Sequence, residues 1–208
     1  KSMNTKRIIS LVASLALVLS LSVGLTGCGD KAAQDDNQGS TDGEGTKYTV
    51  GICQLVRHEA LDAATQGFKD ALEKALGSEN VTFIEQNAQN DSTACSTIVT
   101  DFVSKKVDLI LANATSALQA AFNATTTIPI RGTSITEYGV ALDIKDFNGT
   151  VGGNVSGTSD LAPLTEQGDM ILELFPSAKK VGLLYCSAEP NSGYQVKVME
   201  EYLTGKGI

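Results

Sequence analysis

The chain has 208 residues, of which 42% are hydrophobic and 19% charged, and its formal net charge is −8. This composition is ordinary for a soluble globular protein. The acidity argues against nucleic acid as a partner, because nucleic-acid binding depends on lysine and arginine side chains that neutralise phosphates.

Residues 1–27 have the features of an export signal: a positively charged start, then an uncharged and mostly apolar run over 8–25. A membrane-spanning helix is the alternative, because the run is close to the roughly 20 residues that a bilayer requires. The ending Leu-Thr-Gly-Cys at 25–28 favours the signal, since it resembles the lipobox of bacterial lipoproteins. That resemblance implies that lipid is attached to Cys28, which becomes the mature N-terminus.

The segment 28–46 that follows is predicted to be a disordered tether. After its first residue it contains no aromatic residue and no Leu, Ile or Val. Such a segment cannot bury enough apolar surface to offset the entropy lost on ordering. We therefore expect a folded part that moves relative to an anchor at Cys28.

From residue 47 onward, strand patterns alternate with helix patterns. Strands are predicted at 47–54, 80–86, 107–113 and 128–132, and helices at 58–76, 91–105 and 115–124. After an irregular region over 133–149, the glycine-rich segment 150–157 is predicted to form a bend or an edge strand. A helix at 163–175, a strand at 180–186 and a helix at 195–203 complete the pattern. This alternation predicts an α/β fold with a parallel sheet covered on both faces.

Two units are expected, an N-terminal lobe over 47–157 and a second lobe that begins at 158–208. The first unit has enough strands and helices to enclose a core. The second unit offers one strand between two helices, and one parallel strand cannot cover itself. The sequence also ends where a further strand is expected to begin. We therefore expect this sequence to be a fragment whose second lobe continues.

Three cysteines remain once Cys28 carries lipid, and none has the close spacing of a metal-binding pair. Cys53 and Cys186 lie in apolar, strand-like runs and are expected to be small buried hydrophobic residues. The remaining cysteine is Cys95. Export would permit a disulfide, but the sequence does not indicate one.

A ligand site is expected beyond the carboxyl ends of the strands, where open parallel sheets bind their ligands. Helices begin there, and their N-termini favour a carboxylate. Thr115, Ser116 and Ser192 are each either ordinary N-caps or ligand contacts. Asn113, Thr133 and Ser134 are further candidates, because they also follow apolar strands.

Two ionisable residues near these strand ends have open roles. His58, the only histidine, is either an exposed residue in the first turn of a helix or a pocket residue. Asp160 either caps the helix that starts near Pro163 or pairs with a ligand ammonium group.

No catalytic residues, metal site or cofactor are predicted. A second histidine or a close cysteine pair for a metal is lacking, and so is the G-x-S-x-G nucleophile motif. The glycine-rich segment 150–157 matches neither G-x-G-x-x-G nor the Walker A pattern.

Several stretches together resemble the substrate-binding lipoproteins of bacterial ABC importers, in the group linked to tryptophan, tyrosine and related ligands. They include "EQNAQNDSTACSTIVTDFV", "DLILANATSALQAA", "IPIRGTSITE" and "GTSDLAPLTEQGDM". The resemblance covers nearly all of 47–208. It implies a periplasmic-binding-protein fold of type I, also called a Venus flytrap, in which two flavodoxin-like lobes close on a ligand in the cleft between them.

The resemblance also implies a set of cleft contacts. They are Gln54, His58, Asn113, Thr115, Thr133, Ser134, Thr158, Asp160, Ser187, Glu189, Asn191 and Ser192. Helix N-termini and hydroxyls in this set suit a carboxylate, and Asp160 or Glu189 suits an ammonium group. Arg131, Gly168 and Gly193 depart from the family pattern. Arg131 either reaches the rim of the cleft or weakens its strand, and the two glycines are expected to cost helix stability.

The expected function is that of an extracytoplasmic, lipid-anchored and monomeric solute receptor. It would bind a small ligand, an aromatic or other amino acid, and deliver it to an ABC permease in the membrane. The alternatives are a lipoprotein that senses a ligand for a signalling receptor, a receptor for a nucleoside or sugar-like solute, an exported α/β enzyme and a structural lipoprotein.

Overall fold

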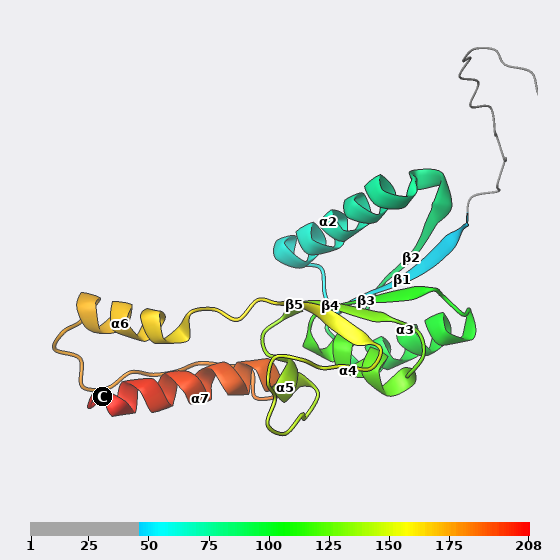
Figure 1. The fold of residues 1–208 in the computed structure, drawn as a ribbon. Helices are drawn as coiled ribbons and strands as arrows, with labels where there is room; N and C mark the ends of the chain where they lie inside the picture. The colour runs from blue at the N-terminus through cyan, green and yellow to red at the C-terminus, as the bar shows by residue number, and fades with distance from the viewer. Residues whose placement is uncertain (1–45) are drawn as a thin grey trace, which may run out of the picture. The chain divides into compact units, whose positions relative to one another are not determined.

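The computed structural model describes residues 46–208. The predicted export signal, Cys28 and all but the last residue of the tether lie outside the described residues. Within them, the chain forms one parallel sheet whose strand order is β2-β1-β3-β4-β5 (Figure 1). The strands are β1 Tyr48–Gln54, β2 Val81–Asn87, β3 Leu109–Asn113, β4 Ile130–Ile135 and β5 Val155–Ser159. The predicted α/β fold class is confirmed.

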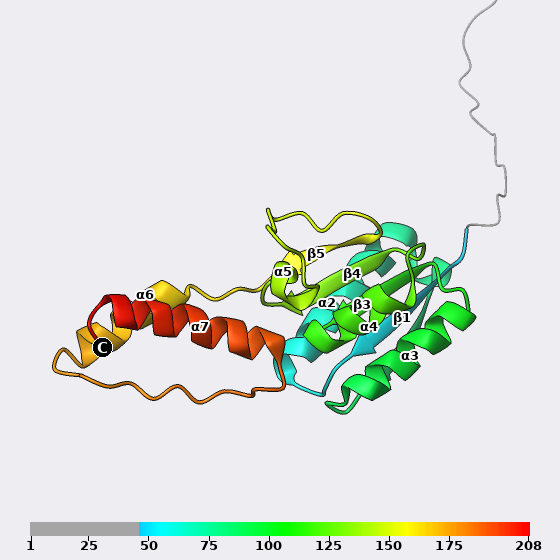
Figure 2. The same ribbon diagram turned by 90° about the horizontal axis from the view of Figure 1, so that it is seen from below.

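Helices follow the strands along the chain, with a single turn of 3-10 helix, η1 Ser78–Asn80, before β2. The helices are α2 Glu59–Leu76, α3 Ser92–Ser104, α4 Thr115–Ala124, α5 Tyr138–Ala141, α6 Leu164–Leu174 and α7 Pro190–Gly205. Helix α2 lies on one face of the sheet, and α3 and α4 lie on the other, as Figures 1 and 2 show. This arrangement is the one expected of β-α-β units with crossovers on both faces.

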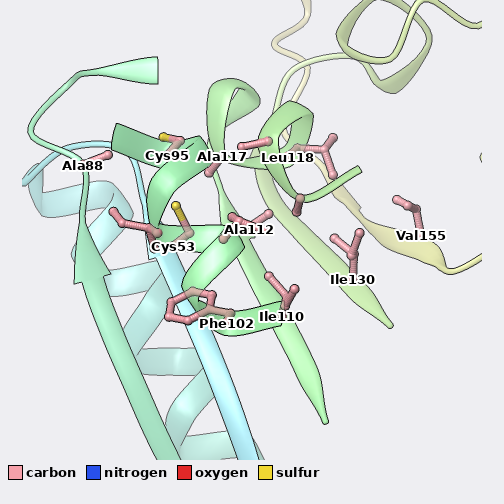
Figure 3. Packing of buried hydrophobic residues seen from close by; sticks show 14 of the residues in the cluster. Cys53, Ala88, Cys95, Phe102, Ile110, Ala112, Ala117, Leu118, Ile130 and Val155 are labelled. Atoms are coloured by element: carbon pink, nitrogen blue, oxygen red, sulfur yellow. The ribbon is translucent and has the colours of Figure 1, made fainter. Parts of the chain in front are cut away.

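Apolar side chains that alternate in direction along the strands cover both faces of the sheet. Val50, Ile52 and Leu111 pack on the α2 side, against Phe68 and Leu72 of that helix. Successive residues of a strand point to opposite faces, and so Cys53, Ile110 and Ala112 belong to the larger core beneath α3 and α4 (Figure 3).

The larger core depends on a close approach between α3 and β1. Phe102 is fully buried, and a Cβ atom at Gly51 would lie only 2.6 Å from its ring. Gly51 therefore provides the space in which the Phe102 ring packs (Figure 3).

Short polar signals set the ends of the helices. His58 is the N-cap of α2, and its Nδ1 accepts a hydrogen bond from the Ala60 N–H at 3.2 Å. Asp91 caps α3 in the same manner, accepting from the Thr93 N–H at 2.7 Å. Gly77 ends α2 with a φ of 88°, which is favourable only for glycine.

Two predicted boundaries are wrong, the end of the fourth strand and the start of the last helix. Strand β4 continues through Thr133 and Ser134 to Ile135, because it pairs with β3 on one side and with β5 on the other. Helix α5 follows, so the region 133–149 is only partly irregular. Helix α7 begins at Pro190, and not at 195, because proline is well suited to the first helical position.

The predicted strand at 180–186 is absent, although the segment is strongly apolar. Leu184 is fully exposed and Cys186 is exposed. A strand is stabilised by hydrogen bonds to a neighbouring strand, and no described strand lies beside this segment. The expectation of a buried Cys186 is therefore wrong, whereas that of a buried Cys53 is confirmed.

Candidate functional site

A cavity of about 280 Å³ lies where the carboxyl ends of the strands meet the N-terminal end of α7. Its volume is close to the lower end of the roughly 300–1,000 Å³ range of ligand pockets. The cavity is lined by Leu55, Val56, His58, Leu61, Asn90, Ala114, Thr115, Ser116, Ser134, Thr136, Asp160, Glu189 and Asn191. These residues come from segments next to all five strand ends and from the start of α7.

The N-terminus of α4 borders the cavity and lacks a side-chain cap. Its N-cap is Ala114, and Thr115 and Ser116 are the first helical residues. The first N–H groups of a helix have no partner within the helix, and the helix dipole is positive there. This end of α4, with the hydroxyls of Thr115 and Ser116, is therefore suited to a carboxylate.

The backbone around the cavity is strained at three lining residues. Ala114 has φ 90° and ψ 161°, a region that is nearly exclusive to glycine. Ser134 has φ 57° and Asn90 has φ 65°. Such conformations cost of order 1–3 kcal/mol each and persist only where the surrounding structure imposes them. The fold therefore holds this rim in a fixed and unrelaxed conformation.

Two residues with carboxylate side chains, Asp160 and Glu189, also line the cavity. The Asp160 N–H donates to the Ile135 carbonyl at 3.0 Å, which holds this residue beside the end of β4. Glu189 is the N-cap of α7, and its carboxylate accepts a hydrogen bond from the Ser192 hydroxyl at 3.2 Å. No lysine or arginine lines the cavity. The pair of carboxylates therefore suits a cation such as an ammonium group.

The charge of Asp160 also affects the buried Tyr138. Burial, followed by the negative charge of Asp160, raises the pKa of Tyr138 to about 12. The Tyr138 hydroxyl stays protonated at neutral pH and donates to the Thr158 carbonyl at 3.2 Å.

Gln54 and Asn113 are buried beneath α2 and do not line the cavity. The Gln54 Oε1 accepts from the Thr65 hydroxyl at 2.7 Å, and the Asn113 Nδ2 donates to the same hydroxyl at 2.9 Å. Asn113 also donates to the Leu61 carbonyl at 2.8 Å, and Gln54 to Asp62 at 2.5 Å. These bonds fix the first turns of α2, which position His58 and Leu61 at the cavity.

Six of the twelve predicted contacts line this cavity: His58, Thr115, Ser134, Asp160, Glu189 and Asn191. Of the six predicted contacts that do not line the cavity, two are the buried Gln54 and Asn113, and the remaining four lie elsewhere. Thr133 and Thr158 line a larger hollow of about 890 Å³ on the α2 side of the sheet. Ser187 is exposed, and Ser192 contacts the Glu189 carboxylate.

The larger hollow is a weaker candidate for the site. Val50, Phe68, Leu72 and other apolar residues form most of its wall, and its charged residues are Asp108 and Arg131. It lies on a face of the sheet, away from the strand ends where polar groups converge. Arg131 therefore does not reach the candidate site.

None of the N-cap alternatives is correct for Thr115, Ser116, Ser192 or Asp160. The N-caps of α4, α6 and α7 are Ala114, Pro163 and Glu189, without side-chain capping bonds. His58 combines both of its predicted roles, because it starts α2, is exposed and lines the cavity.

The two glycines that are expected to cost helix stability have different surroundings. Gly168 in α6 is buried, and a Cβ atom there would lie 2.5 Å from the Tyr202 ring of α7. Gly193 in α7 has open space around it. Gly168 therefore has a packing role, whereas Gly193 has none.

Sequence reasoning missed Asn90 and Thr136, which also line the cavity. Asn90 lies three residues after the end of β2. Thr136 follows the true end of β4, which the sequence analysis placed at residue 132. The polar segment after β2, which includes Asn90, is the signal that could have identified it.

Over residues 46–208, no group of three or more His, Cys, Asp or Glu side chains is arranged to hold a metal ion. In the same part of the chain, every helix is too short or too polar to cross a bilayer.

The family model described as ABC transporter substrate binding protein matches residues 49–208. A Tyrosine-binding protein of Clostridioides difficile is 41% identical over 204 residues, which are 95% of this chain and 57% of that protein. The chain thus spans little more than half the length of this relative.

Two solved structures are also similar. An ABC domain from Streptococcus pneumonia in complex with L-Trp is 32% identical, with a TM-score of 0.72 over 78% of this chain and 55% of that one. A ligand-free, open substrate binding protein with adhesive properties from Clostridium difficile is 43% identical, with a TM-score of 0.60 over 77% of this chain and 55% of that one.

Proposed function

Because the chain belongs to the family of ABC transporter substrate-binding proteins, we propose that it binds a free amino acid and delivers it to an ABC permease. The observation that supports this most is the convergence at one cavity. The N-terminus of α4, the carboxylates of Asp160 and Glu189, and the His58 side chain come from distant parts of the sequence and meet there.

The ligand proposed is a zwitterion with an apolar side chain, and an aromatic amino acid above all. Its carboxylate would lie at the N-terminus of α4, where N–H groups and the Ser134 hydroxyl are available. Its ammonium group would pair with Asp160 or Glu189. Leu55, Val56 and Leu61 would contact its side chain. The similar proteins support this choice, since one is named for tyrosine and another holds L-Trp.

The ligand would be enclosed by the closure of two lobes. We assign 47–157 to the first lobe and 158–208 to the start of the second. Asp160 follows β5, and Glu189 lies at the start of α7, so both carboxylates belong to the second part. Closure around the ligand would form the surface that a permease recognises, and binding would shift the equilibrium toward the closed state. The ligand would leave chemically unchanged.

The protein would act outside the cytoplasm, held at the membrane by lipid on Cys28. The signal-like segment and the Leu-Thr-Gly-Cys sequence support this assignment. The test is mass spectrometry of the protein extracted from membranes: Cys28 is expected to carry lipid, and Cys28→Ser to release the protein from the membrane fraction. An unmodified cysteine on a membrane-bound protein would contradict the anchor.

Calorimetric titration of the intact gene product with the twenty amino acids tests the function. The strongest heats are expected for aromatic amino acids. Asp160→Asn and Glu189→Gln are each expected to weaken binding about tenfold or more, because a charge-assisted hydrogen bond contributes about 1.5–3 kcal/mol.

Glu173→Gln is the matched control, since Glu173 is an exposed residue of α6 outside the cavity. It is expected to leave the affinity unchanged. Equal weakening by all three substitutions would show a general charge effect and would contradict the proposed site. Flat heats with every amino acid would remove the amino-acid assignment.

A further inference from the structure

Two cysteines meet in the core beneath α3. Cys53 is the second-last residue of β1, and Cys95 lies in the first turn of α3, where its N–H donates to the Asp91 carbonyl. Both are fully buried and belong to the same cluster of core residues. Figure 3 shows them next to one another, with the Cys53 sulfur directed toward Cys95.

The two side chains face one another in this core (Figure 3), and Cys95 is the main cause of a raised pKa of the Cys53 thiol. A disulfide requires Cβ atoms about 3.5–4.5 Å apart and a particular torsion about the sulfurs. Two buried cysteines that lie next to one another in this way need only small side-chain movements to approach that geometry. The remaining cysteine of the described residues, Cys186, is exposed and outside this core.

We propose that Cys53 and Cys95 form an intramolecular disulfide when the chain folds in an oxidising compartment. The location rests on the proposed export, and the bond itself rests on the juxtaposition of the two side chains. The oxidant is a second disulfide, of a small thiol or of a disulfide-exchange protein.

The exchange proceeds in two balanced steps. The thiolate of one cysteine attacks the oxidant disulfide, which forms a mixed disulfide and releases one thiolate. The thiolate of the other cysteine then attacks the protein sulfur of the mixed disulfide, and the second oxidant sulfur departs. The two cysteines lose two electrons and two protons, and the oxidant becomes two thiols.

The bond is expected to form before the core closes. The hydrogen bond to Cys95 and then burial raise the pKa of the Cys53 thiol above its ordinary range. The pKa of the Cys95 thiol is lowered, chiefly by Cys53, but both thiols are fully buried. Exchange after folding would therefore be slow, because the oxidant must reach the thiolate. For the same reason, the completed disulfide would resist reductants as long as the protein stays folded.

The disulfide would fix one wall of the candidate site. The Asn90 N–H donates to the Leu55 carbonyl at 2.8 Å, and the Ala88 N–H donates to the Gln54 carbonyl at 2.9 Å. These bonds join the segments that follow β1 and β2, and both Leu55 and Asn90 line the cavity. A bond between Cys53 and Cys95 would close the chain around this junction and reduce the conformational freedom of the unfolded chain.

Mapping of the cysteines after refolding tests the proposal. The full chain is unfolded, reduced, and refolded with either glutathione disulfide or reduced glutathione, then denatured, alkylated and digested. After oxidative refolding, mass spectrometry is expected to find the Cys53 and Cys95 peptides joined and lighter by two hydrogen atoms. The midpoint of thermal unfolding is expected to be higher by about 5–10 °C than that of the reduced chain.

Variants separate this bond from other cysteine chemistry. In Cys186→Ser, the midpoint of thermal unfolding is expected to remain higher after oxidative than after reductive refolding. In Cys53→Ala and in Cys95→Ala, this difference is expected to disappear. If either alanine variant fails to fold, the peptide map of the unsubstituted chain still decides. Alkyl groups on both Cys53 and Cys95 after oxidative refolding, or a link from either to Cys186, would overturn the proposal. This map involves no ligand, so its result is independent of the proposed amino-acid binding.

Discussion

The part of the chain that forms the sheet and the part that follows it contain similar apolar runs with different outcomes. In "VDLILAN" at 107–113, the last five residues form β3, and Leu111 is only 1% exposed. In "KVGLLYC" at 180–186, no strand forms and Leu184 is fully exposed. Strand β3 lies between β1 and β4, whereas none of the strands within residues 46–208 lies beside 180–186.

The difference shows that an apolar pattern alone is not sufficient for a strand. The pattern supplies side chains for two buried faces, but the backbone N–H and C=O groups also need partners along both edges. Helices α6 and α7 form regardless, because their backbone hydrogen bonds are internal.

The same substitution in the two runs gives the largest predicted contrast. Leu111→Ala is expected to lower the free energy of unfolding by about 2–5 kcal/mol, because it leaves a cavity between the sheet and α2. Leu184→Ala is expected to change it by less than about 0.5 kcal/mol, since that side chain has no packing to lose. Urea denaturation of the 208-residue chain measures both values.

Hydrogen exchange provides the control for this contrast. The amides of β3 are expected to be protected, and those of 180–186 to exchange as in an unfolded chain. Protection of 180–186, together with a large cost for Leu184→Ala, would show that this segment is paired and packed in solution, as β3 is.

Most of the fold was predictable, because its causes are local or periodic. The extents of α2, α3 and α4 follow from helical spacing and from caps such as Asp91 and Gly77. The parallel sheet follows from the alternation of elements. The end of β4 was not predictable from the sequence, because it depends on neighbouring strands: Thr133 pairs with β3, and Ile135 pairs with β5 after a shift in register.

The candidate site was predictable to the level of the strand ends, and no further. Position along the chain indicated Asn113 and Thr115 equally, yet Thr115 lines the cavity and Asn113 lies beneath α2. Neighbouring residues at a strand end point in different directions, and their hydrogen-bond partners decide which of them faces the ligand. Those partners, such as Thr65 for Asn113, are far away in sequence.

A pair of glycines tests how tightly the second region is packed. Gly168→Ala is expected to cost about 1–3 kcal/mol, because its Cβ atom would overlap the Tyr202 ring and force α6 and α7 apart. Gly193→Ala, in the open first turns of α7, is expected to stabilise the chain by up to about 1 kcal/mol. Denaturation midpoints measure both, and equal effects would mean that α6 and α7 do not pack in solution.

Tyr138 tests the packing at the far edge of the sheet. The loss of its hydrogen bond to Thr158 in Tyr138→Phe is expected to cost about 1 kcal/mol at neutral pH. Burial, and then Asp160, raise the pKa of Tyr138 to about 12 from an ordinary value of 10.0. The unfolded chain therefore loses this proton first, and stability that is complete below pH 10.0 declines as the pH rises through about 12.

The difference in free energy of unfolding between the wild type and Tyr138→Phe is therefore expected to shrink in this alkaline range. Urea denaturation at several pH values measures it. Tyr185→Phe is the control in the second region, where the side chain is exposed, and it is expected to have little effect at neutral pH. A constant difference between wild type and Tyr138→Phe up to the end of this range would mean that Tyr138 is not buried.

The well-packed sheet region also contains a strained backbone conformation, at Ala114. Ala114→Gly is expected to stabilise the chain by about 1 kcal/mol or less: the relief of an unfavourable backbone conformation exceeds the entropy cost of glycine by a small margin. Ala71→Gly, at an exposed position inside α2, is expected to cost about 0.5–1 kcal/mol. Urea denaturation measures the free energy of unfolding of both variants. A gain for Ala114→Gly with a loss for Ala71→Gly would show that the rim of the candidate site is strained, whereas a loss for both would show that it is not.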